Sequence, residues 1–204
     1  MTDIRTIFFD LGGVLFELQV EQTINYLAEK AGLDPQTVEQ AFPLQDYYRF
    51  ERGEMDEIAF FNCWRAALDS TALTGADFDH SWGILVGEPT ATMALVEKLL
   101  PHYRIWLLSN TNDFHISRLQ AHYPLLERVH GRIYSYREGC RKPEPEIFQV
   151  ALQKAGARAD QSLFIDDMIV NVRAARQLGI RGIEFTSPAE LEIELKLLGL
   201  QGLD

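Results

Sequence analysis

Near its amino end the chain carries an apolar run that stops at a carboxylate followed closely by two glycines. Residues 7–15 have the sequence IFFDLGGVL, and Asp10 ends the apolar run. Such a run is typical of a buried strand in a parallel sheet, and open α/β sheets bind ligands at the carboxyl ends of their strands. Gly12 and Gly13 lack Cβ atoms, so the backbone can turn sharply and approach a small anion or a metal. A carboxylate held there can attack phosphorus and form an acyl phosphate.

Asp10 alone is weak evidence, because a carboxylate at the end of a strand is more often a helix N-cap or a turn residue. Three further polar groups follow in chain order. They are Ser109-Asn110 after the apolar residues 105–108, Lys142 in the segment 141–145, and Asp166-Asp167 after residues 162–165.

This ordered set resembles the haloacid dehalogenase-like (HAD) hydrolase superfamily, whose four motifs are a nucleophilic Asp, a Ser or Thr, a Lys and an acidic pair. The resemblance covers about residues 4–186. Within the superfamily, residues 10–12, 51–54 and 108–112 look most like the branch that contains bacterial α-D-glucose-1-phosphate phosphatases. The phosphatase domain of soluble epoxide hydrolases is similar but less close.

Strand and helix patterns alternate over much of the chain. This alternation predicts an α/β fold with a parallel sheet covered by helices on both faces, and the resemblance makes it Rossmann-like. The strand patterns lie near residues 5–10, 104–109, 131–134, 162–166 and 181–185, and the helical patterns near 91–100, 112–123, 145–156 and 169–178.

Residues 18–87 break the alternation, because they show helical spacing of apolar residues and no convincing strand. The helical segments are 20–30, 35–42, 55–68 and 77–86. We expect an α-helical cap over 18–87, inserted into a core made of residues 1–17 and 88–204, with hinges at residues 16–18 and around Gly87. The alternative is a helical extension packed beside the sheet.

Composition limits the classes of partner. The formal net charge of −11 argues against a nucleic-acid or anionic-membrane surface, and no apolar run reaches membrane-spanning length. The first residues lack the features of a signal peptide, and Cys63 and Cys140 are too few for a disulfide framework. We therefore expect a cytoplasmic protein, and the resemblance implies that its partner is a small phosphorylated metabolite. The sequence does not decide between a monomer and a homodimer.

A phosphate substrate requires a cation at this site. A phosphomonoester is close to a dianion, so Asp10, Asp166 and Asp167 would repel it without one. Carboxylates with a backbone carbonyl form an all-oxygen site that suits Mg²⁺. The resemblance implies that Asp10, the carbonyl of Gly12 and Asp167 bind the metal directly, with Asp166 as a further ligand or as support for the others. The alternative is that the acidic pair only caps the following helix.

The phosphoryl group needs donors as well. Ser109 and Asn110 can bind its oxygens, and Lys142 can supply a positive charge to the phosphate and to the reaction. The alternatives are a Ser-Asn turn and a surface lysine. Asn171 lies one helical turn beyond Asp167 and can point to the same site.

Gly12 departs from the family pattern. Most phosphatases of the superfamily carry there a second Asp that protonates the leaving oxygen, a function worth roughly 10²–10⁴ in rate. The glucose-1-phosphate phosphatase branch shares the glycine. Dehalogenases also lack that Asp, but they lack the paired acids as well.

We therefore predict a Mg²⁺-dependent phosphomonoesterase that forms an aspartyl phosphate, with a small sugar phosphate such as α-D-glucose 1-phosphate as substrate. The alternatives are a phosphate-binding or regulatory protein with weak turnover and, less favoured, a haloacid dehalogenase. His80 and His115 are expected to lie at the surface or to pack against helices rather than to bind a ligand. Residues of the expected cap that could face a sugar, or else form its core and surface, are Tyr47, Tyr48, Arg49, Glu51, Arg52, Trp64 and Trp82.

Overall fold

The computed structural model describes residues 3–203, so the outermost residues of the predicted core ranges, Met1, Thr2 and Asp204, lie outside the described residues. A five-stranded sheet forms the centre of one lobe, and all its neighbouring strands are parallel. Its strands, in spatial order, are β5 (Gly131–Tyr134), β4 (Arg104–Ser109), β1 (Thr6–Phe9), β6 (Ser162–Asp166) and β7 (Arg181–Glu184). β1 is therefore central, between β4 and β6.

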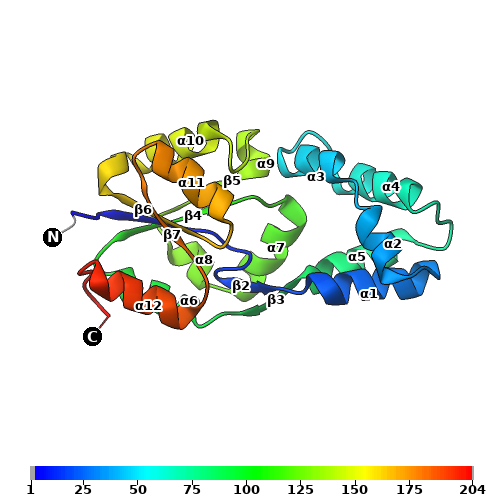
Figure 1. The fold of residues 1–204 in the computed structure, drawn as a ribbon, viewed down its shortest axis with the longest axis horizontal. Helices are drawn as coiled ribbons and strands as arrows, with labels where there is room; N and C mark the ends of the chain where they lie inside the picture. The colour runs from blue at the N-terminus through cyan, green and yellow to red at the C-terminus, as the bar shows by residue number, and fades with distance from the viewer. Residues whose placement is uncertain (1–2, 204) are drawn as a thin grey trace.

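Helices cover both faces of this sheet (Figure 1). One face carries α6 (Thr92–Leu99), α7 (Asp113–His122), α8 (Leu125–Arg128) and α12 (Pro188–Leu197), and the other carries α10 (Pro145–Ala155) and α11 (Ile169–Gln177), with α9 (Ser135–Glu138) beside α10. A short 3₁₀ turn, Ala159–Gln161, precedes β6.

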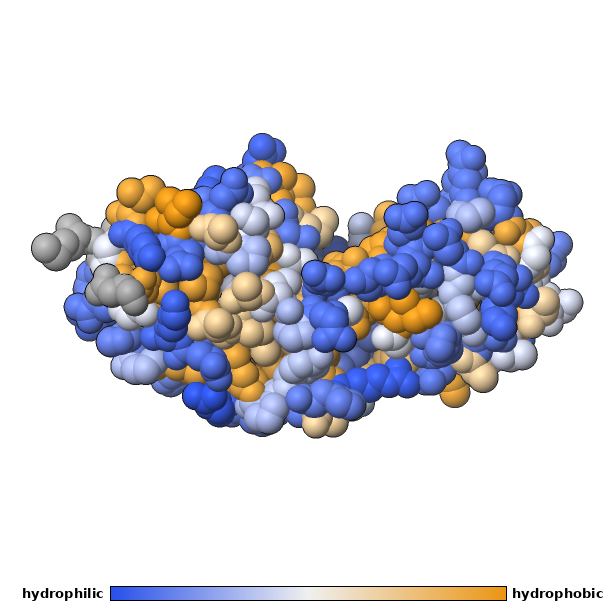
Figure 2. Space-filling model, turned by 90° about the horizontal axis from the view of Figure 1, so that it is seen from below, coloured by the Kyte–Doolittle hydropathy of each residue, from blue (hydrophilic) through white to orange (hydrophobic). Residues whose placement is uncertain are grey.

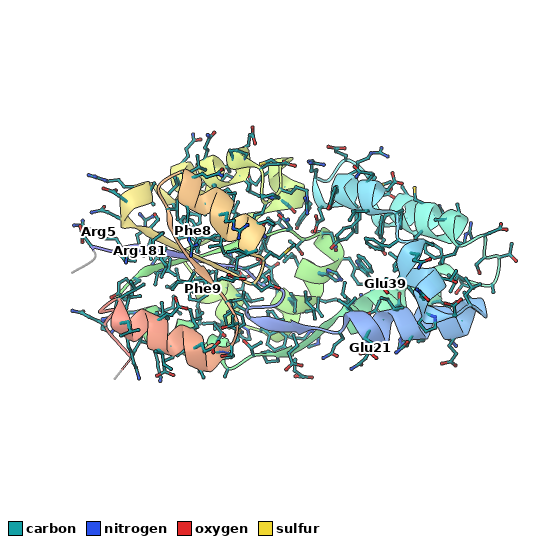
Figure 3. The ribbon with its side chains drawn as sticks, in the orientation of Figure 1. Arg5, Phe8, Phe9, Glu21, Glu39 and Arg181 are labelled. Atoms are coloured by element: carbon teal, nitrogen blue, oxygen red, sulfur yellow. The ribbon has the colours of Figure 1, made fainter. Side chains whose placement is uncertain are left out.

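The strands are apolar on both faces, as a sheet between two helical layers requires. Successive side chains of a strand point to opposite faces. Phe8 accordingly packs in the cluster under α10, while Phe9 packs in the cluster that contains residues of α6 and α7 (Figure 3). Both side chains are at most 1% exposed.

Five helices follow one another between β1 and α6 and form a second lobe, here called the helical insert (Figure 1). They are α1 (Val20–Ala31), α2 (Pro35–Gln40), α3 (Leu44–Glu51), α4 (Glu57–Ala67) and α5 (Gly75–Leu85). The insert has a largely aromatic apolar cluster of its own, with Phe50, Phe60, Phe78 and Trp82 among its buried members. At its base β2 (Phe16–Leu18) pairs antiparallel with β3 (Val86–Pro89).

Local sequence explains where several insert helices begin. The side chains of Asp34 and Asp56 accept hydrogen bonds from the first turns of α2 and α4, and Thr74 and Asp77 form a reciprocal capping box at the start of α5. α1 ends at Gly32, whose φ of 68° is in the left-handed region that favours glycine.

The predicted fold class, a Rossmann-like parallel sheet with helices on both faces and an inserted helical segment, is confirmed. All five predicted strands are present within one residue at each end. Among the described residues, no helix is long and apolar enough to cross a membrane.

Other elements differ from the expectation. The pattern analysis gave no helix at α3, α8, α9 or α12, and both predicted hinge regions are strands, β2 and β3. The helix predicted over 77–86 ends at Leu85, because Val86 already pairs with Leu18. The division into a core and a separate cap with boundaries at 17/18 and 87/88 stays a prediction.

Candidate active site at the carboxyl end of the sheet

Polar side chains from three neighbouring strands meet at the carboxyl edge of the sheet. Asp10 follows β1, Ser109 ends β4 and Asp166 ends β6. β1 lies between the other two strands, and the backbone N–H of Asp10 still donates to the carbonyl of Ile165 at 3.0 Å. The three residues are 8%, 2% and 0% exposed, respectively. The topology therefore brings together residues that are more than 50 positions apart in the chain.

Lys142 bridges two of these carboxylates. Its Nζ lies 2.8 Å from Oδ2 of Asp10 and 2.6 Å from Oδ2 of Asp166, and its side chain is 1% exposed. Burial alone would lower the pKa of Lys142, but the charges of Asp10 and Asp166 outweigh that effect and raise it. Lys142 is therefore a protonated ammonium group whose place is determined by two anions.

Asn110 holds the backbone that carries this lysine. Its side-chain Nδ2 donates to the carbonyl of Lys142 at 2.9 Å, and its Oδ1 accepts from the N–H of Lys142 at 2.8 Å. Both polar ends of the amide are therefore engaged with the protein. The side chain of Asn110 positions Lys142, and its predicted contact with a substrate stays a prediction.

Asp166 is bonded through both oxygens. Oδ1 accepts from the N–H of Met168 at 2.8 Å and from Nδ2 of Asn171 at 2.9 Å, while Oδ2 accepts from Lys142. Asn171, which the sequence indicated only by its spacing, thus orients Asp166.

Asp167 takes no part in that network of side chains and stands at the glycine loop. A Cβ on Gly13 would lie 2.3 Å from Oδ2 of Asp167, and the φ of Gly13 is +76°. Only glycine fits there without displacing that carboxylate.

The three carboxylates form a cluster of oxygen donors. Ligand atoms of Asp10, Asp166 and Asp167 lie within 4.8 Å of one another. Lys142 offsets one of the three negative charges, so burial, together with Asp166 and Asp167, raises the pKa of Asp10 to about 7 against the opposing charge of Lys142. Burial and the charge of Asp166 also raise the pKa of Asp167. A hard divalent cation such as Mg²⁺ fits this set of oxygen donors and this excess of negative charge.

Helix α3 of the insert contacts the segment that carries Lys142. Glu51 accepts from Nε of Arg141 at 2.7 Å, with side chains 4% and 14% exposed, and Arg52 pairs with Glu144. The Arg141 guanidinium also lies 3.9 Å from the centre of the Tyr48 ring. Burial raises the pKa of Glu51, and Arg141 opposes that rise. The sequence signalled neither the partner of Glu51 nor the role of Arg141.

A cavity of about 480 Å³ lies between the sheet edge and the insert. Every residue predicted for catalysis, phosphate or metal lines it, except Asp166, which lies behind Lys142. Of the candidate sugar-facing residues, Tyr47, Tyr48, Glu51, Trp64 and Trp82 are in its wall. The other two candidates form ion pairs instead. Arg49 pairs with Asp46 and Glu54, and Arg52 pairs with Glu144.

Comparison with known proteins matches these features to one family. The family model for haloacid dehalogenase-like hydrolases matches residues 4–179. A solved structure of a HAD-family enzyme from Bacteroides thetaiotaomicron, in complex with magnesium and inorganic phosphate, has a TM-score of 0.80 at 28% identity and covers 90% of this chain and 95% of that chain. The chain belongs to the haloacid dehalogenase-like hydrolase family.

Curated relatives carry different names. A sesquiterpene phosphatase of Aspergillus oryzae is 27% identical, covering 97% of each protein. A D-ribitol-5-phosphate phosphatase of Bacteroides thetaiotaomicron is 24% identical, covering 96% of this chain and 98% of that protein. Mouse acyl-CoA dehydrogenase family member 10 is 26% identical over 95% of this chain, which spans only 19% of that protein.

His115 connects the core helix α7 to the insert. Its ring stacks on Trp82 at 5.2 Å between centroids, and its Nε2 lies 3.2 Å from the Trp82 carbonyl. A carbonyl only accepts, so Nε2 carries the hydrogen. Nδ1 then accepts from Nδ2 of Asn112, whose Oδ1 is held by the N–H of His115. The neutral ring is fully satisfied, as the expectation of a packing role requires, and burial lowers the pKa of His115 to about 4.

This shift makes the stability of the protein depend on pH. The unfolded chain protonates His115 near pH 6.5, whereas the folded protein does so only near pH 4. The contribution of neutral His115 to the free energy of unfolding is therefore complete above pH 6.5 and is lost as the pH falls toward 4. We expect the wild type to lose on the order of 3 kcal/mol relative to His115→Gln over that window, measured by urea unfolding at several pH values. Parallel pH profiles of the two proteins would contradict this assignment.

Proposed function

We propose that this protein is a Mg²⁺-dependent phosphomonoesterase that works through an aspartyl-phosphate intermediate. The observation that carries the proposal is the buried ammonium of Lys142 between Asp10 and Asp166, beside Asp167 and at the polar end of the cavity. A family member of the same fold binds magnesium and inorganic phosphate, which supports the proposal.

The residues divide the chemistry among them. A carboxylate oxygen of Asp10 attacks phosphorus, and the phosphorus–oxygen bond of the ester breaks. The leaving oxygen departs with the bonding electrons and takes a proton from water to give the alcohol. Lys142 offsets negative charge on Asp10 and the phosphoryl group, and the Ser109 hydroxyl and neighbouring backbone N–H groups of the cavity wall hold the phosphoryl oxygens. Water then attacks the phosphorus of the aspartyl phosphate, which releases inorganic phosphate and restores the carboxylate.

The metal would be held by Asp10, the carbonyl of Gly12 and Asp167. Asp166 would support this site by fixing Lys142 through Oδ2, while its Oδ1 accepts from Met168 and Asn171. When bound, Mg²⁺ neutralises the charge that would otherwise repel a phosphate dianion.

The substrate is proposed to be a small phosphorylated metabolite. The D-ribitol-5-phosphate phosphatase supports the sugar-phosphate class predicted from the sequence, with α-D-glucose 1-phosphate as its first member. The relative named a sesquiterpene phosphatase supports a second class, phosphate esters of terpene alcohols. A regulatory protein with weak turnover is the competing function, and a cytoplasmic location remains the expectation.

Replacing Asp10 tests the nucleophile. Asp10→Asn keeps the shape of the side chain but cannot attack, so hydrolysis of p-nitrophenyl phosphate should fall at least 10³-fold. Asp160→Asn, at an exposed carboxylate with 64% side-chain accessibility, is the matched control and should retain full activity. EDTA should abolish the wild-type activity and Mg²⁺ should restore it. Turnover of a few per cent in Asp10→Asn would exclude Asp10, and full activity in EDTA would exclude the metal.

We further propose that residues 18–87 act as a cap over the site. The ion pairs of Glu51 with Arg141 and Arg52 with Glu144 connect α3 to the Lys142 segment, and insert residues line the cavity together with Asp10. A group bound at Asp10 should therefore stabilise both lobes at their contact.

Hydrogen exchange tests this arrangement. Beryllofluoride with Mg²⁺ mimics the phosphoryl group. When both are bound, amides of α3 and of residues 141–144 should exchange at least about tenfold more slowly, because both segments close on the occupied site. Peptides of α12, on the face of the sheet opposite α10 and α11, serve as the internal control. Protection limited to the sheet edge would place the insert outside the chemistry.

The absence of an acidic side chain at Gly12 leads to a separate kinetic prediction. With no acid at this position, charge builds on the leaving oxygen, so kcat/KM should fall steeply as the leaving-group pKa rises across substituted phenyl phosphates. A Cβ on Gly12 would lie 3.1 Å from Cδ2 of Leu18, a side chain 45% exposed and able to move.

Gly12→Asp therefore fits and should flatten that slope, raising the rate for poor leaving groups by up to about 10². Gly12→Ala introduces the same Cβ without the carboxylate and should keep the wild-type slope. A shallow slope in the wild type would mean that another group already protonates the leaving oxygen.

A further inference from the structure

We propose that the alcohol part of the substrate is apolar, so that the site takes phosphate monoesters of extended hydrocarbon alcohols. This inference rests on the phosphatase function proposed above and concerns the same cavity. The reaction is R–O–PO₃²⁻ with water giving R–OH and inorganic phosphate, so it needs no further reactant.

The cavity has one charged end and an apolar body. The core supplies the charged end, with Asp10, Ser109, Lys142 and Asp167. Beyond it, both lobes contribute mainly aliphatic and aromatic side chains. Leu18, Val20, Ile24, Leu44, Leu85 and Met168 belong to this part of the wall. The volume of about 480 Å³ is within the range of pockets that enclose drug-sized ligands, about 300–1,000 Å³.

Several of these side chains are exposed although they are large and apolar. Leu18, Val20, Leu44 and Met168 are 45–55% exposed, and they are four of the eight exposed large hydrophobic residues found among residues 3–203. A space-filling view shows a notch between the two lobes with hydrophobic residues on both sides (Figure 2). Exposed apolar surface gathered in one concave place indicates a binding site for an apolar group.

Three polar side chains in the wall beyond the charged end are already engaged within the protein. Thr23 Oγ1 donates to the carbonyl of Gln19 at 2.9 Å, His115 is satisfied by Trp82 and Asn112, and Glu51 is paired with Arg141. A sugar carries a hydroxyl on almost every carbon, and burying these groups without partners is costly. Glu39 on α2, labelled in Figure 3, is exposed to solvent and also lines the cavity.

Two donors remain in the aromatic part of the wall. Nε1 of Trp64 and Nε1 of Trp82 are buried, and neither has a hydrogen-bond partner in the part of the chain that the structure describes. Both atoms are closed off from solvent, so neither offers a hydrogen bond to a sugar hydroxyl in the cavity.

A homologous series of n-alkyl phosphates tests the proposal. Butyl, hexyl and octyl phosphate have nearly the same leaving-group pKa, so the chemical step should be equal and differences should report binding of the chain. Each added methylene that enters the cavity should raise kcat/KM about fourfold, the ratio that about 0.8 kcal/mol per buried CH₂ gives. α-D-Glucose 1-phosphate and D-ribitol 5-phosphate should then be poorer substrates than octyl phosphate.

Leu44→Asn should weaken this dependence. The side chain is half-exposed in the cavity wall, so the variant should fold, and the octyl-to-butyl ratio of kcat/KM should fall about fivefold. Leu197→Asn makes the same exchange at a residue 82% exposed on α12, outside the cavity, and should leave the ratio unchanged. Equal effects of the two variants would contradict the assigned wall.

Two further measurements distinguish a failure of the proposed phosphatase function from a failure of the apolar substrate. Acetyl phosphate has no apolar body, so its Mg²⁺-dependent hydrolysis reports the proposed phosphatase function alone. The affinities of butyl, hexyl and octyl phosphonate, measured by calorimetry with Mg²⁺, report the wall without turnover. Hydrolysis of acetyl phosphate together with a flat alkyl series would overturn the apolar substrate and leave the phosphatase intact. No hydrolysis, together with phosphonate affinity that rises with chain length, would overturn the phosphatase and keep the apolar site.

Discussion

The ammonium group of Lys142 between the carboxylates of Asp10 and Asp166 is the interaction on which the site depends. Asp10 and Asp166 are buried at the ends of adjacent strands, and two buried anions without a cation would be costly. The segment that carries Lys142 is fixed from two sides, by the amide of Asn110 in the core and by α3 of the insert through Arg141 and Glu51. The position of the cation therefore depends on contacts from both lobes.

The same interaction leaves an excess of negative charge, and this excess limits what the site can bind. One lysine faces three carboxylates, and the glycine loop brings Asp167 to within contact of Gly13, where no other residue fits. In the proposed function, an anionic phosphate would enter such a place only with a further cation, so electrostatics would couple metal binding to phosphate binding. The preference of the oxygen donors for Mg²⁺ follows from the same residues.

Sequence patterns predicted the sheet and its polar edge, because buried parallel strands are continuous apolar runs and the motif residues follow them directly. They indicated five of the wall residues but not its aliphatic part, since Leu18, Leu44 and Met168 come from separate elements and form one wall only after folding. The pair Glu51 and Arg141 joins positions 90 residues apart and has no local signal. The helix α3, which brings Glu51 there, follows Pro43 and is only eight residues long, so its apolar spacing covered barely two turns.

The charged end and the apolar wall together make the lack of a proton donor at Gly12 more important. An apolar cavity excludes water, which strengthens the attraction between Lys142 and the phosphoryl group but also makes charge on a leaving alkoxide more costly. A hydrocarbon alcohol therefore needs a proton more than a sugar hydroxyl at an anomeric carbon does. Tyr47 and Glu51 both lie in the cavity wall, and burial raises the pKa of each. The helix that fixes the Lys142 segment thus also brings these two titratable groups into the cavity wall.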